Sequence, residues 1–155
     1  MAIKKSVVVS SVAAFKPQSK FGRYKVSPKE DRTVDGIVFD SKWEAKVYTH
    51  LIQFIPKEHI HMQVPFLLQP KFKLAGTSIR EVKYVADFVL STTPLVHEDN
   101  KLTSIPADAV IVDAKGHLTD IFKLKNKMFM YTYQVPIVQV KRPADVQDLV
   151  DKYVV

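Results

Sequence analysis

Two short apolar segments that each carry an aspartate constrain this chain more than any other feature. Residues 84–89 (YVADFV) and 110–113 (VIVD) are rich in β-branched and aromatic residues, so both predict strands. A carboxylate within an apolar strand is costly to bury unless a partner neutralises its charge. Two such acids, Asp87 and Asp113, would repel each other on neighbouring strands, and a divalent cation relieves that repulsion. The sequence therefore predicts a sheet that carries a charged site.

The second aspartate opens the triplet Asp113-Ala114-Lys115. Residues two apart on a strand point to the same face, so Asp113 and Lys115 converge while Ala114 packs inward and leaves its carbonyl free as a ligand. A cation held by the acids activates water for attack on a phosphate, and a lysine beside it holds a phosphate oxygen. The alternative is structural: an ordinary salt bridge between Asp113 and Lys115, with Asp87 a satisfied acid.

Composition limits the metals and the partners. The chain has 155 residues, 46% of them hydrophobic, which suits one globular domain. It has no cysteine, so disulfides and cysteine-based zinc sites are excluded, and hard ions such as Mg²⁺ or Mn²⁺ are favoured. The net charge of +7 attracts polyanions, although a merely soluble basic protein fits it as well. No apolar run is long enough to cross a bilayer, so we expect no membrane contact and a cytoplasmic location.

Local patterns divide the chain into an N-terminal arm, residues 1–30 with a valine-rich strand, and a domain at 31–155. Asp35-Gly36 between β-prone pairs predicts a hairpin. Ser41, with Glu44 three residues later, predicts a capped helix. In chain order the expected elements are a hairpin at 32–39, a helix at 41–54, strands at 65–74 and 81–91, a loop at 92–106, a strand at 109–113, a helix at 119–133 with Ile121, Leu124 and Met128 on one side, a strand at 134–141 and a helix at 143–150. This order predicts a mixed α/β fold and not a repeated βαβ array.

Five segments together resemble the PD-(D/E)XK nuclease superfamily, and within it small phage-encoded endonucleases, including Holliday junction resolvases of the phage endonuclease I type. Ala86-Asp87 stands in place of Pro-Asp, and Asp113-Ala114-Lys115 is the D-x-K element. The loop at 92–109 is longer than this pattern expects, and the chain before the first matching segment does not match it. The five segments are residues 34–45 (VDGIVFDSKWEA), 68–72 (LQPKF), 84–88 (YVADF), 112–116 (VDAKG) and 122–129 (FKLKNKMF).

The resemblance implies a restriction-endonuclease-like mixed sheet flanked by helices, in the order helix–strand–strand–strand–helix–strand. It implies a Mg²⁺- or Mn²⁺-dependent endodeoxyribonuclease in which Glu44, Asp87 and Asp113 bind the metal, the Ala114 carbonyl assists, and Lys115 is the catalytic lysine. We expect selectivity for branched DNA such as Holliday junctions. Cutting both strands of a junction needs two sites, so we expect a homodimer. A phage or prophage protein would act in the host cytoplasm.

Several residues have a second interpretation. Glu44 is also placed as a capping-box glutamate, and the two roles are compatible. Lys125, Lys127 and His117 are candidates for contacts with DNA phosphates, or else ordinary solvated side chains. The pair His59 and His61 lacks an evident third ligand for zinc. The main functional alternative is a non-catalytic DNA-binding or assembly module on a nuclease fold. An enzyme of small nucleotides is disfavoured because no glycine-rich phosphate loop is present.

Overall fold

The protein has a mixed α/β architecture, as the sequence predicts. The computed structural model describes residues 26–98, 101–102, 104–115 and 117–154, so the valine-rich part of the expected N-terminal arm lies outside the described residues. Its central sheet has four strands, β3 (Ile60–Gln69), β6 (Val82–Leu90), β9 (Val110–Asp113) and β10 (Ile137–Gln139), in the order β10-β9-β6-β3. The pair β10–β9 is parallel, and the other two pairs are antiparallel. Among the described helices, none has the length and apolar character needed to cross a membrane.

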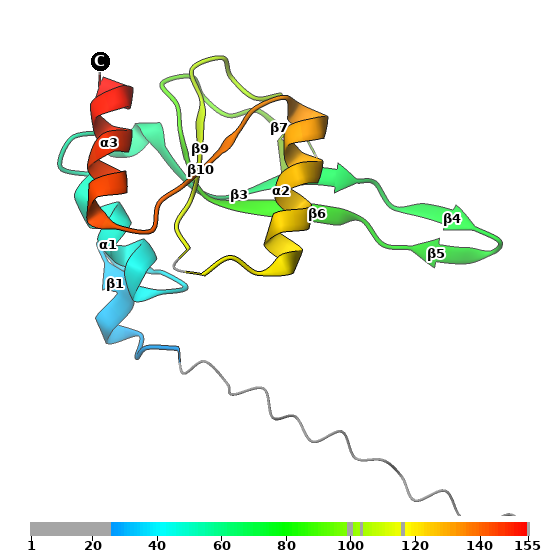
Figure 1. Ribbon diagram of the computed structural model, residues 1–155, viewed down its shortest axis with the longest axis horizontal. Helices are drawn as coiled ribbons and strands as arrows, with labels where there is room; N and C mark the ends of the chain where they lie inside the picture. Colours follow the sequence, from blue (N-terminus) through cyan, green and yellow to red (C-terminus); the bar gives the residue numbers. More distant parts are fainter. Residues whose placement is uncertain (1–25, 99–100, 103, 116, 155) are drawn as a thin grey trace, which may run out of the picture.

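Helices cover both faces of this sheet (Figure 1). Helices α1 (Lys42–Leu51) and α3 (Pro143–Val154) share one core with Phe88 and Val112, whereas α2 (Asp120–Tyr133) shares a second core with Val89 and Ile111. Adjacent residues of a strand point to opposite faces, so the two cores lie on opposite sides of the sheet. On the first side, His50 Nε2 lies 2.9 Å from Gln147 Oε1 and ties α1 to α3.

The short elements before α1 form as the local sequence predicts. Strands β1 (Thr33–Val34) and β2 (Ile37–Val38) pair in antiparallel fashion across Asp35 and Gly36, which have φ of 52° and 76°. The Ser41 hydroxyl accepts the Glu44 backbone N–H at 3.1 Å and caps α1. This helix ends at Leu51, earlier than the expected residue 54. Two short 3₁₀ turns, η1 (Glu30–Arg32) and η2 (Lys57–His59), complete this region.

Helix α2 has the predicted length but turns a different face to the core. Ile121 and Leu124 are 69% and 60% exposed, whereas Phe122 and Phe129 are buried. The Phe129 ring lies 5.0 Å from the Phe66 ring between centroids, in an edge-on contact. Both sides of the helix carry apolar residues, and the aromatic side is buried because it meets aromatic rings on the sheet.

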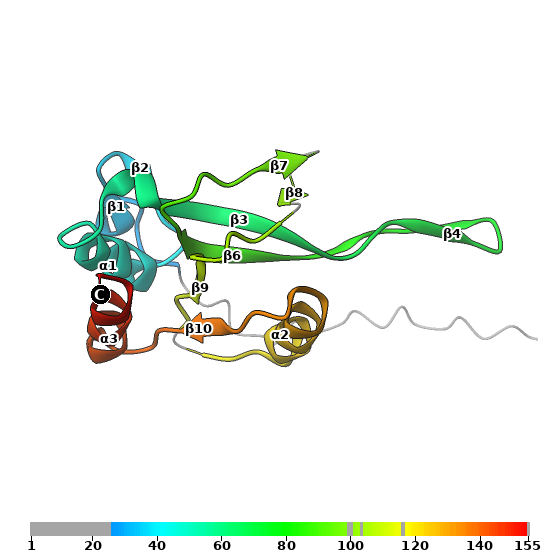
Figure 2. The same ribbon diagram turned by 90° about the horizontal axis from the view of Figure 1, so that it is seen from above.

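The hairpin of β3 and β6 is longer than predicted. Strand β3 begins at Ile60, five residues before the expected start, and it tolerates Pro65 because it is an edge strand. Beyond Gln69 the hairpin continues into β4 (Phe72–Leu74), which lies within the first expected strand, and β5 (Thr77–Ile79), which begins in the expected connection at 75–78. In both views this extension projects well past α2 (Figures 1 and 2).

The segment at 92–106 is not the plain loop that the sequence predicts. It contains a small hairpin of β7 (His97–Glu98) and β8 (Lys101–Leu102). Leu102 is only 3% exposed and belongs to the core beneath α2. Asp108 accepts hydrogen bonds from the Ser91 and Thr92 hydroxyls at 3.0 and 2.7 Å and holds the start of this segment. The short, polar strands of this hairpin explain why periodicity failed to reveal it.

In the hairpin of β3 and β6, the side of the sheet to which alternate residues point changes midway along the strands, and this change positions the site. Ala86 packs beneath α2, whereas Phe88, two residues later, packs beneath α1 and α3. Regular strands keep such residues on one face, so the pleat is interrupted between them. Opposite this point, between the pairs Met62↔Phe88 and Val64↔Ala86, Gln63 has φ of 51°. Local irregularities of this kind re-aim side chains, and here the affected residue is Asp87.

Candidate active site

The three side chains that the sequence predicts to converge lie together where β9 ends. The Lys115 ammonium nitrogen is 2.7 Å from Asp113 Oδ1 and 3.8 Å from Asp87 Oδ2. Strand β9 pairs with β6 in the register Phe88↔Val112, which brings the two acids alongside each other. Asp113 is fully buried and Asp87 is 7% exposed, so the two acidic side chains are largely removed from water.

Backbone geometry fixes the orientation of Asp87. The Ala114 N–H donates a hydrogen bond to Asp87 Oδ2 at 2.8 Å. Ala114 itself is 2% exposed and packs inward, as the alternation of the strand predicts. The role of its carbonyl as a metal ligand stays a prediction.

Glu44 joins the cluster from the first turn of α1. The Ser41 hydroxyl lies 3.1 Å from Glu44 Oε1, so the glutamate takes part in capping as well. Burial raises the pKa of Glu44 from 4.5 to about 7, and the negative charge of Asp87 acts in the same direction. Asp40, an exposed acid just before α1, adds to the repulsion on both carboxyls. The Glu44 side chain therefore takes part in the cap of α1 and also belongs to the acidic cluster.

Buried carboxylate oxygens without partners show where a cation would fit. Within the described residues, Glu44 Oε2 and Asp113 Oδ2 are buried and have no hydrogen-bond partner. Burial also raises the pKa of Asp87 to about 6, although the positive charge of Lys115 opposes this. Unpaired buried acceptors and mutually repelling acids are both relieved by a hard divalent ion.

In the part of the chain that the structure describes, no three His, Asp or Glu side chains form a ready-made metal-binding group, and this includes His59 and His61. Asp113 Oδ1 is held by Lys115 instead. The donor set suits Mg²⁺ or Mn²⁺ by its oxygen chemistry.

Tyr84 is a site residue that the sequence did not reveal. Its hydroxyl donates to Asp113 Oδ1 at 3.2 Å, and the side chain is 3% exposed. Burial, together with the charges of Asp113 and Asp87, holds the pKa of Tyr84 above its usual value, so it remains a donor. Nothing in residues 84–89 distinguishes this tyrosine from an ordinary strand residue; only the pairing with β9 does.

Lys115 remains a cation although it is half-buried. Burial lowers its pKa, but the hydrogen bond to Asp113 and the nearby carboxylate charges outweigh this, and the net pKa is raised. The ammonium nitrogen also lies 5.4 Å from the centroid of the Phe122 ring, at the start of α2. Lys115 therefore supplies a positive charge on the solvent-accessible side of Asp87 and Asp113.

A shallow groove of about 370 Å³ runs from Lys115 along the start of α2. Lys83 of β6 and Lys125 of α2 line it together with Lys115, so the predicted candidate Lys125 lies beside the site. Lys127 is exposed, and two positions along a helix separate it from Lys125 by about 200° of rotation. His117 is exposed in the loop between β9 and α2. Lys127 and His117 are thus not brought into this groove.

A second groove, of about 200 Å³, is bordered by Asp87 itself. Asp40 and Gln63 line it with Asp87. Sequence reasoning missed both residues. A positive φ at a glutamine leaves no trace in the sequence, whereas Asp40, next to the Ser41 cap, could have been noticed as a further acid.

Comparison with known proteins gives a family without a described activity. A family model described as "Protein of unknown function (DUF1064)" matches residues 18–143. No curated protein and no solved structure matches the chain.

Proposed function

This chain belongs to the DUF1064 family, and we propose that it is a metal-dependent endodeoxyribonuclease. The proposal rests on the burial and the hydrogen-bond partners of Asp113. It is fully buried, it shares one oxygen between Lys115 and Tyr84, and its other oxygen has no partner among the described residues. A purely structural salt bridge would satisfy both oxygens, because an unpaired buried acceptor costs about 1–3 kcal/mol. A site kept for a cation accounts for the unpaired oxygen.

The carboxylates of Glu44, Asp87 and Asp113 would hold Mg²⁺ or Mn²⁺, with the Ala114 carbonyl as a further donor. When bound, such an ion supplies Lewis-acid chemistry: it lowers the pKa of water and stabilises the charge that gathers on a phosphate.

The remaining steps belong to the chain itself. Lys115, held protonated, binds a non-bridging phosphate oxygen and stabilises the negative charge of the transition state. Tyr84 keeps the Asp113 carboxylate in one orientation by donating to it. Lys83 and Lys125 extend the positive charge along the groove and bind phosphates on either side of the cut.

The substrate class follows from the resemblance of the five segments. We propose preferential cleavage of branched DNA, such as four-way junctions, by a homodimer that presents two sites. A panel of duplex, flap, fork and four-way junction DNA, with single-stranded DNA alongside, measures this preference directly.

The test of the activity is cleavage of the panel in Mg²⁺ or Mn²⁺, and its loss in EDTA. Asp113→Asn should abolish cleavage, while Asp148→Asn, which removes an equivalent charge from the exposed side of α3, should cleave like the wild type. If the wild type cleaves no member of the panel, the proposal fails, and a DNA-binding module remains. If Asp113→Asn cleaves as fast as the wild type, the site assignment is wrong. Release of mononucleotides alone would indicate an enzyme of small nucleotides.

A further inference from the structure

An arm made of β4, β5 and their flanking residues, 70–80, projects from the sheet past α2 (Figures 1 and 2). Its strands pair through Phe72↔Ile79, Lys73↔Ser78 and Leu74↔Thr77. Isolated two-stranded ribbons are marginally stable in water. An exposed ribbon of this kind leaves its side chains and backbone edges accessible to a binding partner.

The two sides of the arm differ in chemistry. Alternation along each strand places Lys73 and Ser78 on one side and the apolar residues on the other. Lys71 and Arg80 directly flank the paired residues, before β4 and after β5. On the side opposite Lys73, Phe72 and Leu74 are 45% and 66% exposed. The arm thus carries exposed apolar side chains opposite Lys73, and two further cations flank its strands.

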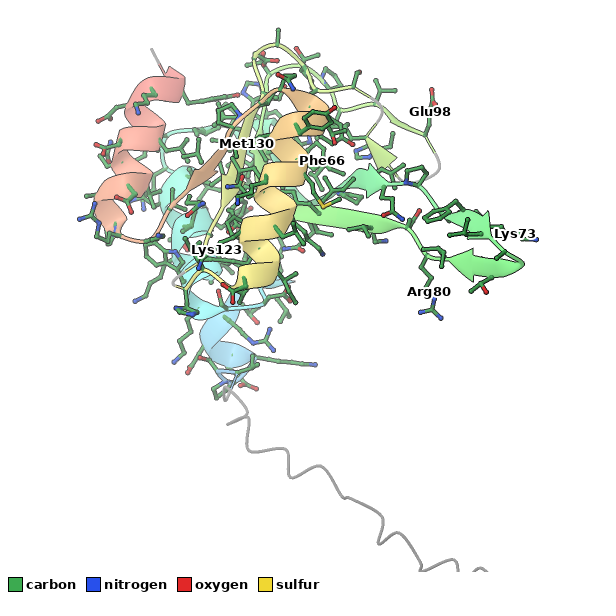
Figure 3. All side chains as sticks on the ribbon, turned by 45° about the vertical axis from the view of Figure 1, so that its right-hand side comes forward. Phe66, Lys73, Arg80, Glu98, Lys123 and Met130 are labelled. Carbon is green, nitrogen blue, oxygen red and sulfur yellow. The ribbon has the colours of Figure 1, made fainter. Side chains whose placement is uncertain are left out.

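The charge of the arm has a single sign. Residues 70–80 contain Lys71, Lys73 and Arg80 and no acidic residue. Within the described part of the chain, none of these three cations forms an ion pair. Figure 3 shows Lys73 and Arg80 extending from the arm into open space. Uncompensated cations on a projecting ribbon fit a polyanion, not a neutral or basic protein surface.

The dimensions of the arm match duplex DNA. Ser78 of β5 precedes Asp87 of β6 by nine residues, a span of about 30 Å along extended chain. One turn of B-DNA measures about 34 Å, and its major groove admits a two-stranded β-ribbon. The arm therefore reaches phosphates about one helical turn from the acidic cluster.

We propose that this arm is a second DNA contact that binds in a groove of the duplex. Lys71, Lys73 and Arg80 bind phosphates, and Phe72 and Leu74 pack against sugars and base edges. Its distance from the cut phosphate rests on the proposed nuclease function, whereas the binding itself does not.

The test is the affinity of the full chain for a labelled duplex about three helical turns long, measured in EDTA so that no cleavage occurs. The arm variant carries Lys71→Gln, Lys73→Gln and Arg80→Gln. The control carries Lys46→Gln, Lys57→Gln and Lys152→Gln, three exposed lysines on other surfaces, so the net charge of the two variants is the same.

Three lost phosphate contacts should make the negative slope of log affinity against log salt shallower by about 2.7. Between 50 and 200 mM salt, the wild type should consequently lose about 40-fold more affinity than the arm variant. The control variant should keep a slope close to that of the wild type.

Equal slopes for the arm and control variants would overturn the proposal, as would a wild type that binds no duplex. A third outcome would also overturn it: unchanged DNA affinity in the arm variant, with Phe72→Ser and Leu74→Ser converting a dimer into a monomer, would make the arm a contact between subunits. Arm-dependent binding by a protein that cleaves nothing would instead leave this proposal standing and remove the nuclease function.

Discussion

Replacing Glu44 by glutamine tests the charge state of the site in the metal-free protein. Burial and the charge of Asp87 raise the pKa of Glu44 from 4.5 to about 7. The folded protein therefore holds this proton more tightly than the unfolded chain does. The resulting stability is fully present below the unfolded pKa and is lost as the pH rises through about 7.

The size of the effect follows from those two pKa values. At pH 8 their difference lowers the free energy of unfolding of the wild type by about 3 kcal/mol. Glu44→Gln should recover this stability because glutamine has no charge to bury. At pH 5 the difference between variant and wild type should fall below about 1 kcal/mol. At pH 8, Mg²⁺ should make the wild type more stable than Glu44→Gln, because the ion stabilises a wild type that binds it and has less effect on the variant.

Urea unfolding in EDTA at pH 5 and pH 8 measures these differences. The single tryptophan, Trp43, is a suitable fluorescent probe because its indole N–H donates to the Val140 carbonyl at 2.9 Å and leaves this setting on unfolding. Glu58→Gln, at an exposed site in η2, is the control and should show no pH-dependent gain. A Glu44→Gln protein that is no more stable than the wild type at pH 8, or equally stabilised at both pH values, would refute the reasoning.

Three further changes test the packing and the site. Phe129→Ala removes a fully buried ring and should cost about 3–5 kcal/mol of stability in chemical denaturation; a loss below about 1 kcal/mol would contradict the packing beneath α2. Gln134→Gly should raise the free energy of unfolding by up to about 1 kcal/mol, because Gln134 ends α2 with φ of 57° and glycine adopts this conformation without strain; thermal unfolding measures it, and a lower melting temperature would argue against the cap. Tyr84→Phe should weaken Mg²⁺ binding about 10- to 100-fold in a titration while the far-ultraviolet spectrum is preserved; an unchanged affinity would show that the hydroxyl does not orient Asp113.

Local rules account for much of what the sequence predicts correctly. The turn at Asp35-Gly36 and the Ser41 cap depend on neighbouring residues alone, and both form. The apolar strands that carry the two aspartates also form as the local pattern predicts. The two-residue spacing of Asp113 and Lys115 brings their side chains to 2.7 Å from each other. Such features are visible in the sequence because their physical causes act within a few residues.

What only the tertiary structure decided depends on residues far apart in the chain. Helix α2 carries apolar residues on two sides, and the aromatic rings of the sheet select Phe129 over Leu124 for burial. Tyr84 reaches Asp113 only because β6 pairs with β9. The left-handed conformation of Gln63, in β3 opposite Asp87, occurs at a residue that is not glycine, so the sequence does not indicate it. The sequence by itself determined which acids and which lysine are available; strand pairing and competition for burial determined how they meet, because those energies are summed over contacts that no local pattern contains.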